Sequence, residues 1–178
     1  MIIRNAALDD CAAIARVQVD SYRATYAGIF PQEYLDGFTY EEQEQDWRGL
    51  LSAGGAYIVL VAEADGVIAG YALGRPAPTG GAPYDCELVA LHVRREFQKQ
   101  GVGSRLAAAM ADALHDRGCR SLMLWVLADN PARRFYERLG GRLLDETQIT
   151  NGAVEVAYGW DDIASLSARS LGLEEDRE

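Results

Sequence analysis

The sequence predicts one mixed α/β domain, with a mostly antiparallel sheet of about seven strands, a central parallel strand pair and about four flanking helices. An apolar strand at residues 86–93, a helix at 103–117 and an apolar strand at 121–126 form a strand–helix–strand unit. Such a unit implies a right-handed crossover and parallel pairing. Asp65-Gly66 and Asn151-Gly152 each separate two apolar runs, and both dipeptides are strong hairpin signals.

Local signals predict the remaining elements. Residues 2–4 form a short first strand, and Asp9 stands where the N-cap of a helix reaching about residue 23 would lie. Thr39 and Glu42 form a capping box for a second helix, which ends at Gly54-Gly55. The other predicted elements are strands at 56–63, 67–75, 142–149 and 153–160, and a short helix at 132–139. We expect the domain to cover residues 1–162 and an acidic C-terminal tail to cover 163–178.

Composition and charge exclude several classes of protein. The net charge of −10 argues against a general nucleic-acid or anionic-membrane binder, because both need a positive surface. The apolar runs are far shorter than the roughly 20 residues of a membrane span, and the N-terminus lacks the features of a signal peptide. Cys11, Cys86 and Cys119 are odd in number and scattered, which predicts reduced thiols in a cytoplasmic protein. With only two histidines, we expect no metal centre.

A glycine-rich segment, Gln98-Lys99-Gln100-Gly101-Val102-Gly103, joins the strand at 86–93 to the helix after it. Its glycines let the backbone turn tightly, and free N–H groups at a positive helix end bind phosphate or pyrophosphate. Residues 91–105 carry four basic side chains and one acidic one, which indicates one specific anionic ligand; a solvated connector is the alternative. A dinucleotide fold would need GxGxxG directly after its strand, and a Walker loop would need GxxxxGK followed by Ser or Thr. The sequence has neither.

Several ordered motifs resemble the GNAT superfamily of acyl-CoA-dependent N-acyltransferases. The segment 98–103 resembles the family's Q/R-x-x-G-x-G/A pyrophosphate loop, and Leu88, Leu91 and Val93 resemble the strand that leads into it. Residues 130–140 are similar to its N-x-x-A-x-x-F-Y-x-x-x-G segment. The resemblance covers residues 2–160. One departure is Gly141, where the family usually has Phe.

The resemblance implies acetyl-CoA as co-substrate and assigns residues to it. Main chain at Leu91, His92 and Val93 would pair with the pantetheine arm. Residues of the later motif, Asn130, Ala132, Arg133 and Phe135, would lie beside the cofactor. Backbone N–H groups would hold the pyrophosphate at Gln98, Lys99, Gln100, Gly101, Val102, Gly103 and Ser104.

Acetyl transfer to an amine needs a base and an acid. An amine with a pKa near that of Lys is neutral only about once in 10³ molecules at pH 7, so a base must remove its proton. We predict Glu87, eleven residues before Gln98, because a carboxylate in an apolar strand is costly unless it is used or paired. A salt-bridged glutamate is the alternative reading, and Asp85 and His92 are the other candidates. Simple strand alternation places His92 on the face opposite Glu87.

The leaving thiolate needs a proton, and Tyr136 occupies the position where the family often has that acid. Its alternative is a core tyrosine beside the cofactor. Cys86 as an acyl-carrying nucleophile would imply a ping-pong route, but it flanks no obvious base. We therefore expect direct transfer in a ternary complex. A catalytically silent acyl-CoA-binding module, acting as a sensor or interaction domain, is the rival reading.

The sequence indicates less about the acceptor than about the cofactor. We expect an amine pocket shaped by the loop at 76–83 and by residues of the aromatic segment at 22–38, although most of those aromatics belong to the core. The acidic balance favours a cationic amine, and a small molecule is favoured over a protein. A homodimer through the last hairpin or the tail is possible. The predicted acceptor-binding side chains are Tyr22, Arg23, Tyr26 and Tyr34.

Overall fold

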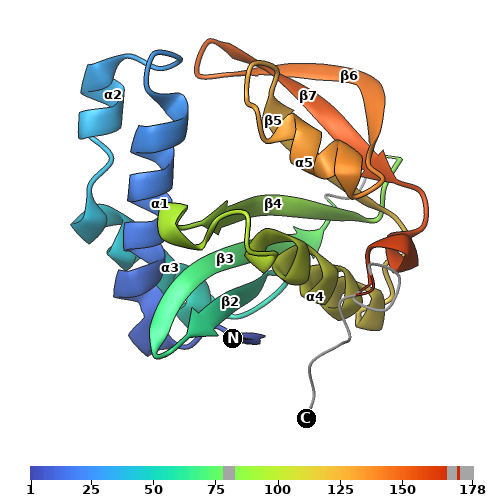
Figure 1. Ribbon diagram of the computed structural model, residues 1–178, viewed down its shortest axis with the longest axis horizontal. Helices are drawn as coiled ribbons and strands as arrows, with labels where there is room; N and C mark the ends of the chain where they lie inside the picture. The colour runs from blue at the N-terminus through green and yellow to red at the C-terminus, as the bar shows by residue number, and fades with distance from the viewer. Residues whose placement is uncertain (78–82, 168–171, 173–178) are drawn as a thin grey trace.

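Seven strands form one mixed sheet in the order β1-β2-β3-β4-β5-β7-β6 in a computed structural model that describes residues 1–77, 83–167 and 172 (Figure 1). Every neighbouring pair is antiparallel except β4 and β5, which are parallel. The predicted fold class is confirmed. The strands are β1 (Ile2–Asn5), β2 (Ile58–Ala64), β3 (Val67–Pro76), β4 (Cys86–Val93), β5 (Leu122–Leu127), β6 (Arg142–Thr150) and β7 (Ala153–Trp160).

Helices cover both faces of the sheet. On one face, α4 packs against β2, β3 and β4, and its apolar side chains join the largest core cluster. On the other face, α1 and α3 pack together, and α1 also contacts β3 and β4. The five α-helices of the described chain are α1 (Cys11–Tyr26), α2 (Gln32–Asp36), α3 (Tyr40–Ala53), α4 (Val102–Asp116) and α5 (Arg133–Arg138).

Both predicted hairpins are present with two-residue turns. Asp65 and Gly66 have φ values of 50° and 77°, and Asn151 and Gly152 have φ values of 50° and 81°. Positive φ at both central positions matches the twist of a two-residue hairpin, which explains why Asp-Gly and Asn-Gly are such reliable signals. The α3 cap is also as expected, because Thr39 Oγ1 accepts a hydrogen bond from the Glu42 N–H.

The start of α1 corrects a detail. The helix begins one residue later than predicted, with Asp10 at the N-cap in place of Asp9. The Asp10 side chain accepts hydrogen bonds from the Ala7 N–H and from both terminal nitrogens of Arg4. These bonds hold the pKa of Asp10 below its usual range, chiefly through Arg4. Asp10, and not the adjacent Asp9, thus lies at the N-cap of α1, where it binds Arg4 of β1.

The cysteines are a second correction. Cys86, at the start of β4, forms a disulfide with Cys119, in the connection between α4 and β5, and only Cys11 is free. The two residues are 33 positions apart in sequence, yet their Cα atoms are 6.1 Å apart, a separation that a disulfide spans. Parallel pairing of β4 with β5 brings them together at the same end of the sheet. Counting cysteines could not reveal that proximity.

Residues beyond 162 begin as part of the core. Ile163 and Leu166, in a short 3₁₀ turn (η3, Ile163–Leu166), are buried in the cluster that includes α4. Residues 168–171 and 173–178, most of the expected acidic tail, lie outside the described residues, and the boundary at 162 stays a prediction. No helix in the described part of the chain has the length and apolar character needed to cross a membrane.

Candidate active site

The parallel strand pair opens into a gap. β4 pairs with β5 only at Cys86 with Leu122 and at Glu87 with Met123, whereas its pairing with β3 continues to Val93. Figure 1 shows the β5–β7 part of the sheet separating from β4 beyond that point. One edge of β4 therefore presents main-chain groups without a strand partner. An extended, amide-containing molecule could bind such an edge as an additional strand would.

The N-terminus of α4, on one side of this gap, has main-chain N–H groups that are unpaired within the described chain. Lys99 and Gly101 have φ values of 60° and 81°, and Gly101 is the N-cap of the helix. The first helical hydrogen bond runs from the Arg105 N–H to the Gly101 carbonyl. The N–H groups of residues 102–104 therefore precede the hydrogen-bonded part of α4 and point out of its positive end. This geometry suits a pyrophosphate.

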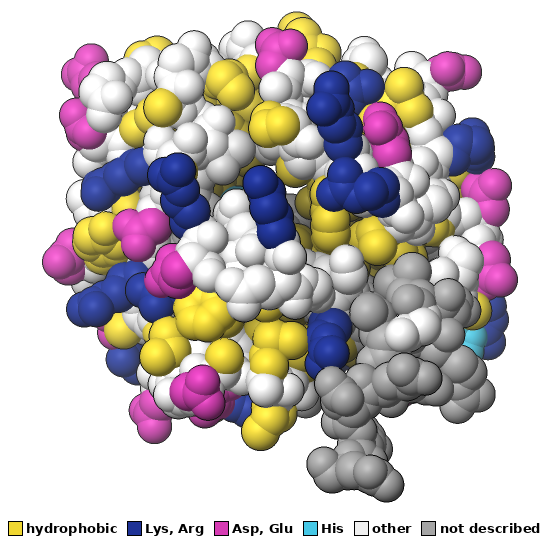
Figure 2. Space-filling view, viewed as in Figure 1, with side chains coloured by type: hydrophobic (Ala, Val, Ile, Leu, Met, Phe, Trp, Pro, Cys, Tyr) yellow, Lys and Arg dark blue, Asp and Glu magenta, His cyan; other side chains and the backbone are white. Residues whose placement is uncertain are grey.

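Side chains brace the loop and surround it with positive charge. Gln98 Nε2 donates to the Val93 carbonyl over 3.0 Å, and Gln100 Nε2 donates to the Glu96 carbonyl over 2.8 Å. Both amide side chains thus hold the loop, so ligand binding would fall to its backbone. Figure 2 shows Lys and Arg side chains in a band across the middle of the face that carries the start of α4.

Close packing of α4 against α5 explains the second glycine. A Cβ added at Gly103 would lie 3.3 Å from Phe135 Cζ and 3.7 Å from Leu91 Cδ2. Gly103 is thus needed for the approach of the Phe135 ring, whereas Gly101 is needed for its left-handed backbone. The two glycines of the motif serve different physical purposes.

The residues before α5 position that helix. Asn130 is buried, and its Oδ1 accepts a hydrogen bond from the Ala132 N–H over 2.9 Å. Arg133 donates to the Tyr158 hydroxyl and to the Ala128 carbonyl, so its guanidinium supports the fold around β7. Asn130 keeps its amide nitrogen for a ligand, whereas Arg133 is already engaged.

Tyr136 lies on α5, 9% exposed, in the core cluster on the α4 face. Burial raises the pKa of Tyr136 to about 12, so its hydroxyl keeps its proton at neutral pH.

Trp160 accounts for the departure at Gly141. A Cβ at Gly141 would lie 2.7 Å from Cζ2 of Trp160, and the indole Nε1 donates to the Leu139 carbonyl over 2.9 Å. The Trp160 ring therefore occupies space beside residue 141 that a larger side chain would need. The departure substitutes one ring for another and leaves the gap unchanged.

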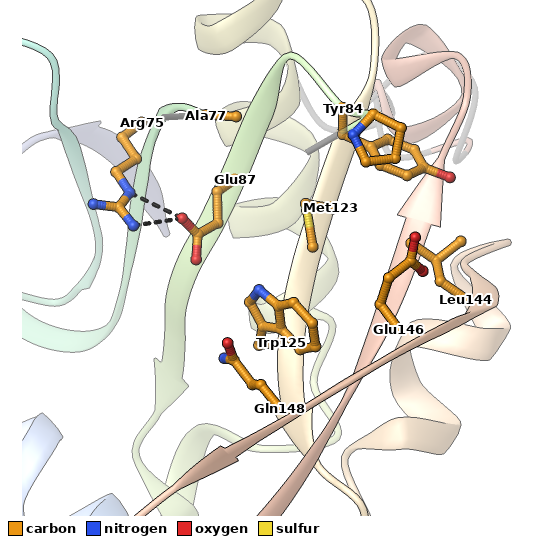
Figure 3. Close-up of a pocket in the computed structure, with 10 residues that line it drawn as sticks. Arg75, Ala77, Tyr84, Glu87, Met123, Trp125, Leu144, Glu146 and Gln148 are labelled. Atoms are coloured by element: carbon orange, nitrogen blue, oxygen red, sulfur yellow. Dashed lines mark hydrogen bonds and ion pairs between the residues drawn. The ribbon is translucent and has the colours of Figure 1, made fainter. Parts of the chain in front are cut away.

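Glu87 faces the opposite side of the gap from α4. Its Oε2 accepts from Nε and Nη2 of Arg75 over 2.9 and 2.7 Å, and Figure 3 shows both bonds ending on this one oxygen. The other carboxylate oxygen, Oε1, is left for a different partner. The salt bridge that we gave as the alternative role of Glu87 is present, but it engages only one of the two carboxylate oxygens.

A β-bulge in β4 corrects the expected orientation of His92. Gly74 pairs with Leu88 and Leu73 with Ala90, so Val89 is an extra residue in β4. The extra residue reverses the alternation, and His92 lies on the same face as Glu87. Simple alternation, which placed it on the opposite face, was therefore wrong.

His92 packs among aromatic rings of the α1 face. Its ring centroid is 5.5 Å from that of Tyr22 and 5.4 Å from that of Tyr71. Burial lowers the pKa of His92 to about 4, so the ring is neutral near pH 7. The half-buried side chain thus packs against aromatic rings beneath α1, and the main chain of His92 lies on the free edge of β4.

The other two candidates for chemistry have structural roles. Asp85 Oδ2 accepts hydrogen bonds from the Arg120 and Ser121 N–H groups, which keeps the pKa of Asp85 below its usual range. Cys86 is in the disulfide and has no thiol with which to carry an acyl group. Glu87 is thus the carboxylate of this strand segment that faces the gap with a free oxygen.

The four predicted acceptor residues separate into two groups. Tyr22 and Tyr26 lie edge to face with their centroids 4.8 Å apart, and burial is the main reason that the pKa of each is raised. Tyr34 is exposed and accepts a hydrogen bond from Asn151 in the β6–β7 turn. Arg23 instead donates to the Phe38 carbonyl and lies over the Tyr40 ring. Arg23 braces the end of α1, and none of the four predicted acceptor residues lines the cavity described next.

Sequence reasoning missed most of a cavity of about 370 Å³ beside Glu87. Met123 and Trp125 of β5 form its floor, with Glu87 and Arg75 on one side and Glu146 on the other (Figure 3). The signal that could have found it is the run of polar side chains in the strand at residues 145–148. No group of three or more metal-ligating side chains occurs among residues 1–77, 83–167 and 172.

Residues 19–141 match the acetyltransferase (GNAT) family. The chain belongs to this family. It is 34% identical over 167 residues to an uncharacterized N-acetyltransferase, YuaI, of Bacillus subtilis (strain 168), covering 92% of this chain and 95% of that protein. It is 29% identical to a phosphinothricin N-acetyltransferase of Streptomyces viridochromogenes, over 78% of this chain and 72% of the relative. An acyltransferase enzyme is thus indicated, as the motifs predicted.

Solved structures share the fold. PaiA N-acetyltransferase from Thermoplasma acidophilum, solved in complex with coenzyme A, has a TM-score of 0.72 at 20% identity, covering 89% of this chain and 98% of that one. YncA, a putative acetyltransferase from Salmonella typhimurium solved with acetyl-CoA, has a TM-score of 0.67 at 20% identity, covering 100% of this chain and 96% of that one. At these identities the likeness concerns the arrangement of the sheet and helices.

Proposed function

We propose that this GNAT acetyltransferase moves an acetyl group from acetyl-CoA directly to a primary amine, in a ternary complex. The observation that carries the proposal is that β4 and β5 stop pairing after Glu87. The resulting gap has a helix N-terminus and Tyr136 toward one face, and Glu87 with a cavity toward the other. A thioester lying along β4 would be open to an amine from the second face.

Each group has a place in the reaction. Glu87 Oε1, directly or through a water molecule, accepts a proton from the incoming ammonium, which frees the nitrogen lone pair. The nitrogen attacks the thioester carbonyl, a C–N bond forms and the C–S bond breaks, and the nitrogen then releases its second proton, which through solvent restores the proton that Tyr136 gives up. Main-chain N–H groups of the free β4 edge stabilise the oxygen as it becomes negative. Tyr136 donates its proton to the departing thiolate, whose pKa as a thiol is near the ~8.5 of cysteine.

The backbone geometry of β4 and α4 supports the following placement of the cofactor. The N–H groups of residues 102–104 would hold the pyrophosphate, and the main chain of residues 91–93 would pair with the pantetheine amides. Asn130 would donate its free amide nitrogen to a cofactor carbonyl, and Phe135 would pack beside the arm. The complexes of the PaiA and YncA proteins with coenzyme A and acetyl-CoA support this choice of co-substrate.

For the acceptor, the cavity supports a small molecule over a protein. A volume of about 370 Å³ lies in the range of small-molecule pockets. The name of the Streptomyces relative, a phosphinothricin N-acetyltransferase, is consistent with a small acceptor. A homodimer and a cytoplasmic location remain parts of the same proposal.

A thiol-release assay with acetyl-CoA and pooled small amines tests the proposal. We expect amine-dependent release of coenzyme A, with the acetylated amine identified by mass. The rival function, a silent acyl-CoA-binding module, predicts binding of acetyl-CoA by calorimetry without transfer to any amine in the pool. That result would overturn the enzymatic proposal and leave the cofactor site intact.

A further inference from the structure

The charges around the cavity beside Glu87 are unbalanced. Each guanidinium nitrogen of Arg75 has a partner: Nε and Nη2 bind Glu87, and Nη1 donates to the Tyr57 hydroxyl over 3.0 Å. Glu146, on the far side of the cavity, has no hydrogen-bond or ion-pair partner among the described residues. One carboxylate of the wall is therefore neutralised and the other is not.

Neighbouring residues do not supply the missing positive charge. Arg142 lines an adjacent hollow with Glu146, but it pairs with Asp161 and donates to the Tyr84 hydroxyl. Asp145 adds another acid to that hollow. Residues 78–82, which in the sequence separate the cavity-lining Ala77 and Pro83, are Pro, Thr, Gly, Gly and Ala and so carry no charged side chain. The surroundings favour a positively charged occupant.

The floor of the cavity also suits a cation. Trp125 lies between Glu87 and Glu146 (Figure 3), and an indole ring attracts a cation placed over its face. Gln148 donates its Nε2 to Glu155 over 2.7 Å, which leaves its carbonyl oxygen as an acceptor at the cavity wall. An apolar linker between two ammonium groups could lie across Met123 and Trp125.

We propose that the acceptor is a short dicationic amine, a diamine or polyamine, whose unreactive ammonium group binds Glu146 while the other end meets Glu87. This inference rests on the proposed function and names its substrate class. An acceptor with a carboxylate at its far end would meet Glu146 without a free cation to receive it. A monoamine would lack the ion pair.

Three acceptors of matched chain length test the inference: butane-1,4-diamine, pentylamine and 4-aminobutanoate. Their far ends are an ammonium, a methyl and a carboxylate group, respectively. For the wild-type chain with acetyl-CoA we expect kcat/KM to fall in that order, with about a tenfold preference for the diamine over the monoamine, as one added ion pair in the ternary complex would produce. Equal values, or a preference for either competitor, would overturn the inference while leaving the transferase activity in place.

Variants locate the preference. In Glu146→Gln the diamine-to-monoamine ratio of kcat/KM should fall about tenfold, mainly through KM. The Glu146→Lys variant should have a higher kcat/KM for 4-aminobutanoate than for the diamine. Asp145→Asn removes the same charge at the neighbouring position, outside this cavity, and should keep the wild-type ratio. An equal loss in Asp145→Asn and Glu146→Gln would mean a general field effect and would contradict a specific site at Glu146.

A binding measurement separates this inference from the proposed function. Calorimetry in the presence of coenzyme A should detect the diamine with wild-type protein and much weaker binding with Glu146→Gln. Diamine binding without acetyl transfer would contradict the enzymatic proposal alone. Transfer to other amines without diamine binding would contradict the substrate class alone.

Discussion

The two faces of the gap between β4 and β5 are built differently. The α4 face is made of two short continuous segments, a glycine loop and the residues leading into α5, and it offers mostly backbone groups. The opposite face is made of single side chains from four strands, among them Glu87, Trp125 and Glu146. A shared co-substrate can be held by backbone geometry, whereas a particular acceptor must be recognised by side chains. The α4 face can therefore be recognised from a sequence motif, whereas the opposite, acceptor-binding face cannot.

We expect the largest loss of activity at Glu87, because it is the residue of the acceptor face to which we assign catalysis. Glu87→Gln should lower kcat/KM for the amine about 10³-fold at pH 7, within the range of general-base catalysis. The loss should shrink at higher pH, because more of the amine is already neutral. Steady-state kinetics from pH 6.5 to 9.5 measure this.

Arg75→Gln is the control for Glu87, because it removes the same ion pair and keeps the carboxylate. It should retain most of the activity. A pH–rate profile for Glu87→Gln identical to that of the wild type would reject the base assignment. A loss in Arg75→Gln equal to that in Glu87→Gln would mean that the salt bridge, and not the base, is what matters.

Tyr136 is the test of chemistry on the α4 face. Tyr136→Phe should lower kcat about 10²-fold while the Kd for acetyl-CoA changes little, because the ring remains and only the proton donor is lost. With a pKa of about 12, the wild-type hydroxyl stays protonated through pH 9, so the loss should be the same across that range. Unchanged turnover would remove the acid role.

Gly103 tests whether the α4 face depends on backbone packing. Gly103→Val would push its methyl groups into the Phe135 ring, and overpacking of this kind typically costs about 1–3 kcal/mol. We expect the Kd for acetyl-CoA, measured by calorimetry, to rise about tenfold. Gly49→Val, where an added Cβ on α3 meets nothing within 4 Å, is the matched control and should bind normally. Equal affinities would show that close α4–α5 packing is not required.

We expect the smallest effect at His92, which changes the pH dependence of stability and takes no part in the proposed reaction. Its pKa is lowered by burial from 6.5 to about 4, so the unfolded chain binds the proton more readily than the folded one. Stability from His92 is complete above about pH 6.5 and is lost as pH falls toward 4. Between pH 6.5 and 4.5, urea unfolding should show wild type losing about 2 kcal/mol more than His92→Gln. His115→Gln, on α4, should behave as wild type, and a large fall in kcat for His92→Gln would place the side chain in the reaction.

Local patterns predicted the elements well, and the errors share a cause. The succession of strands and helices along the chain, both hairpin turns and the cap at Thr39 follow from residues adjacent in sequence. The orientation of His92 depends on a bulge at Val89, which is defined by pairing with β3. The partner of Cys86 depends on the parallel alignment of β4 with β5. Neither dependence is visible in a short window of sequence.

The sequence by itself determined the fold class and the glycine loop, because each depends on backbone propensity or on a contiguous motif, and it singled out Tyr136 and Glu87 as candidates. Only the tertiary structure decided how far β4 and β5 stay paired, which face His92 occupies and that Glu146 stands across Trp125 from Glu87. The physical reason is distance along the chain. Hydrogen bonds within a turn or helix join near neighbours, whereas the cavity joins strands that only the sheet brings together.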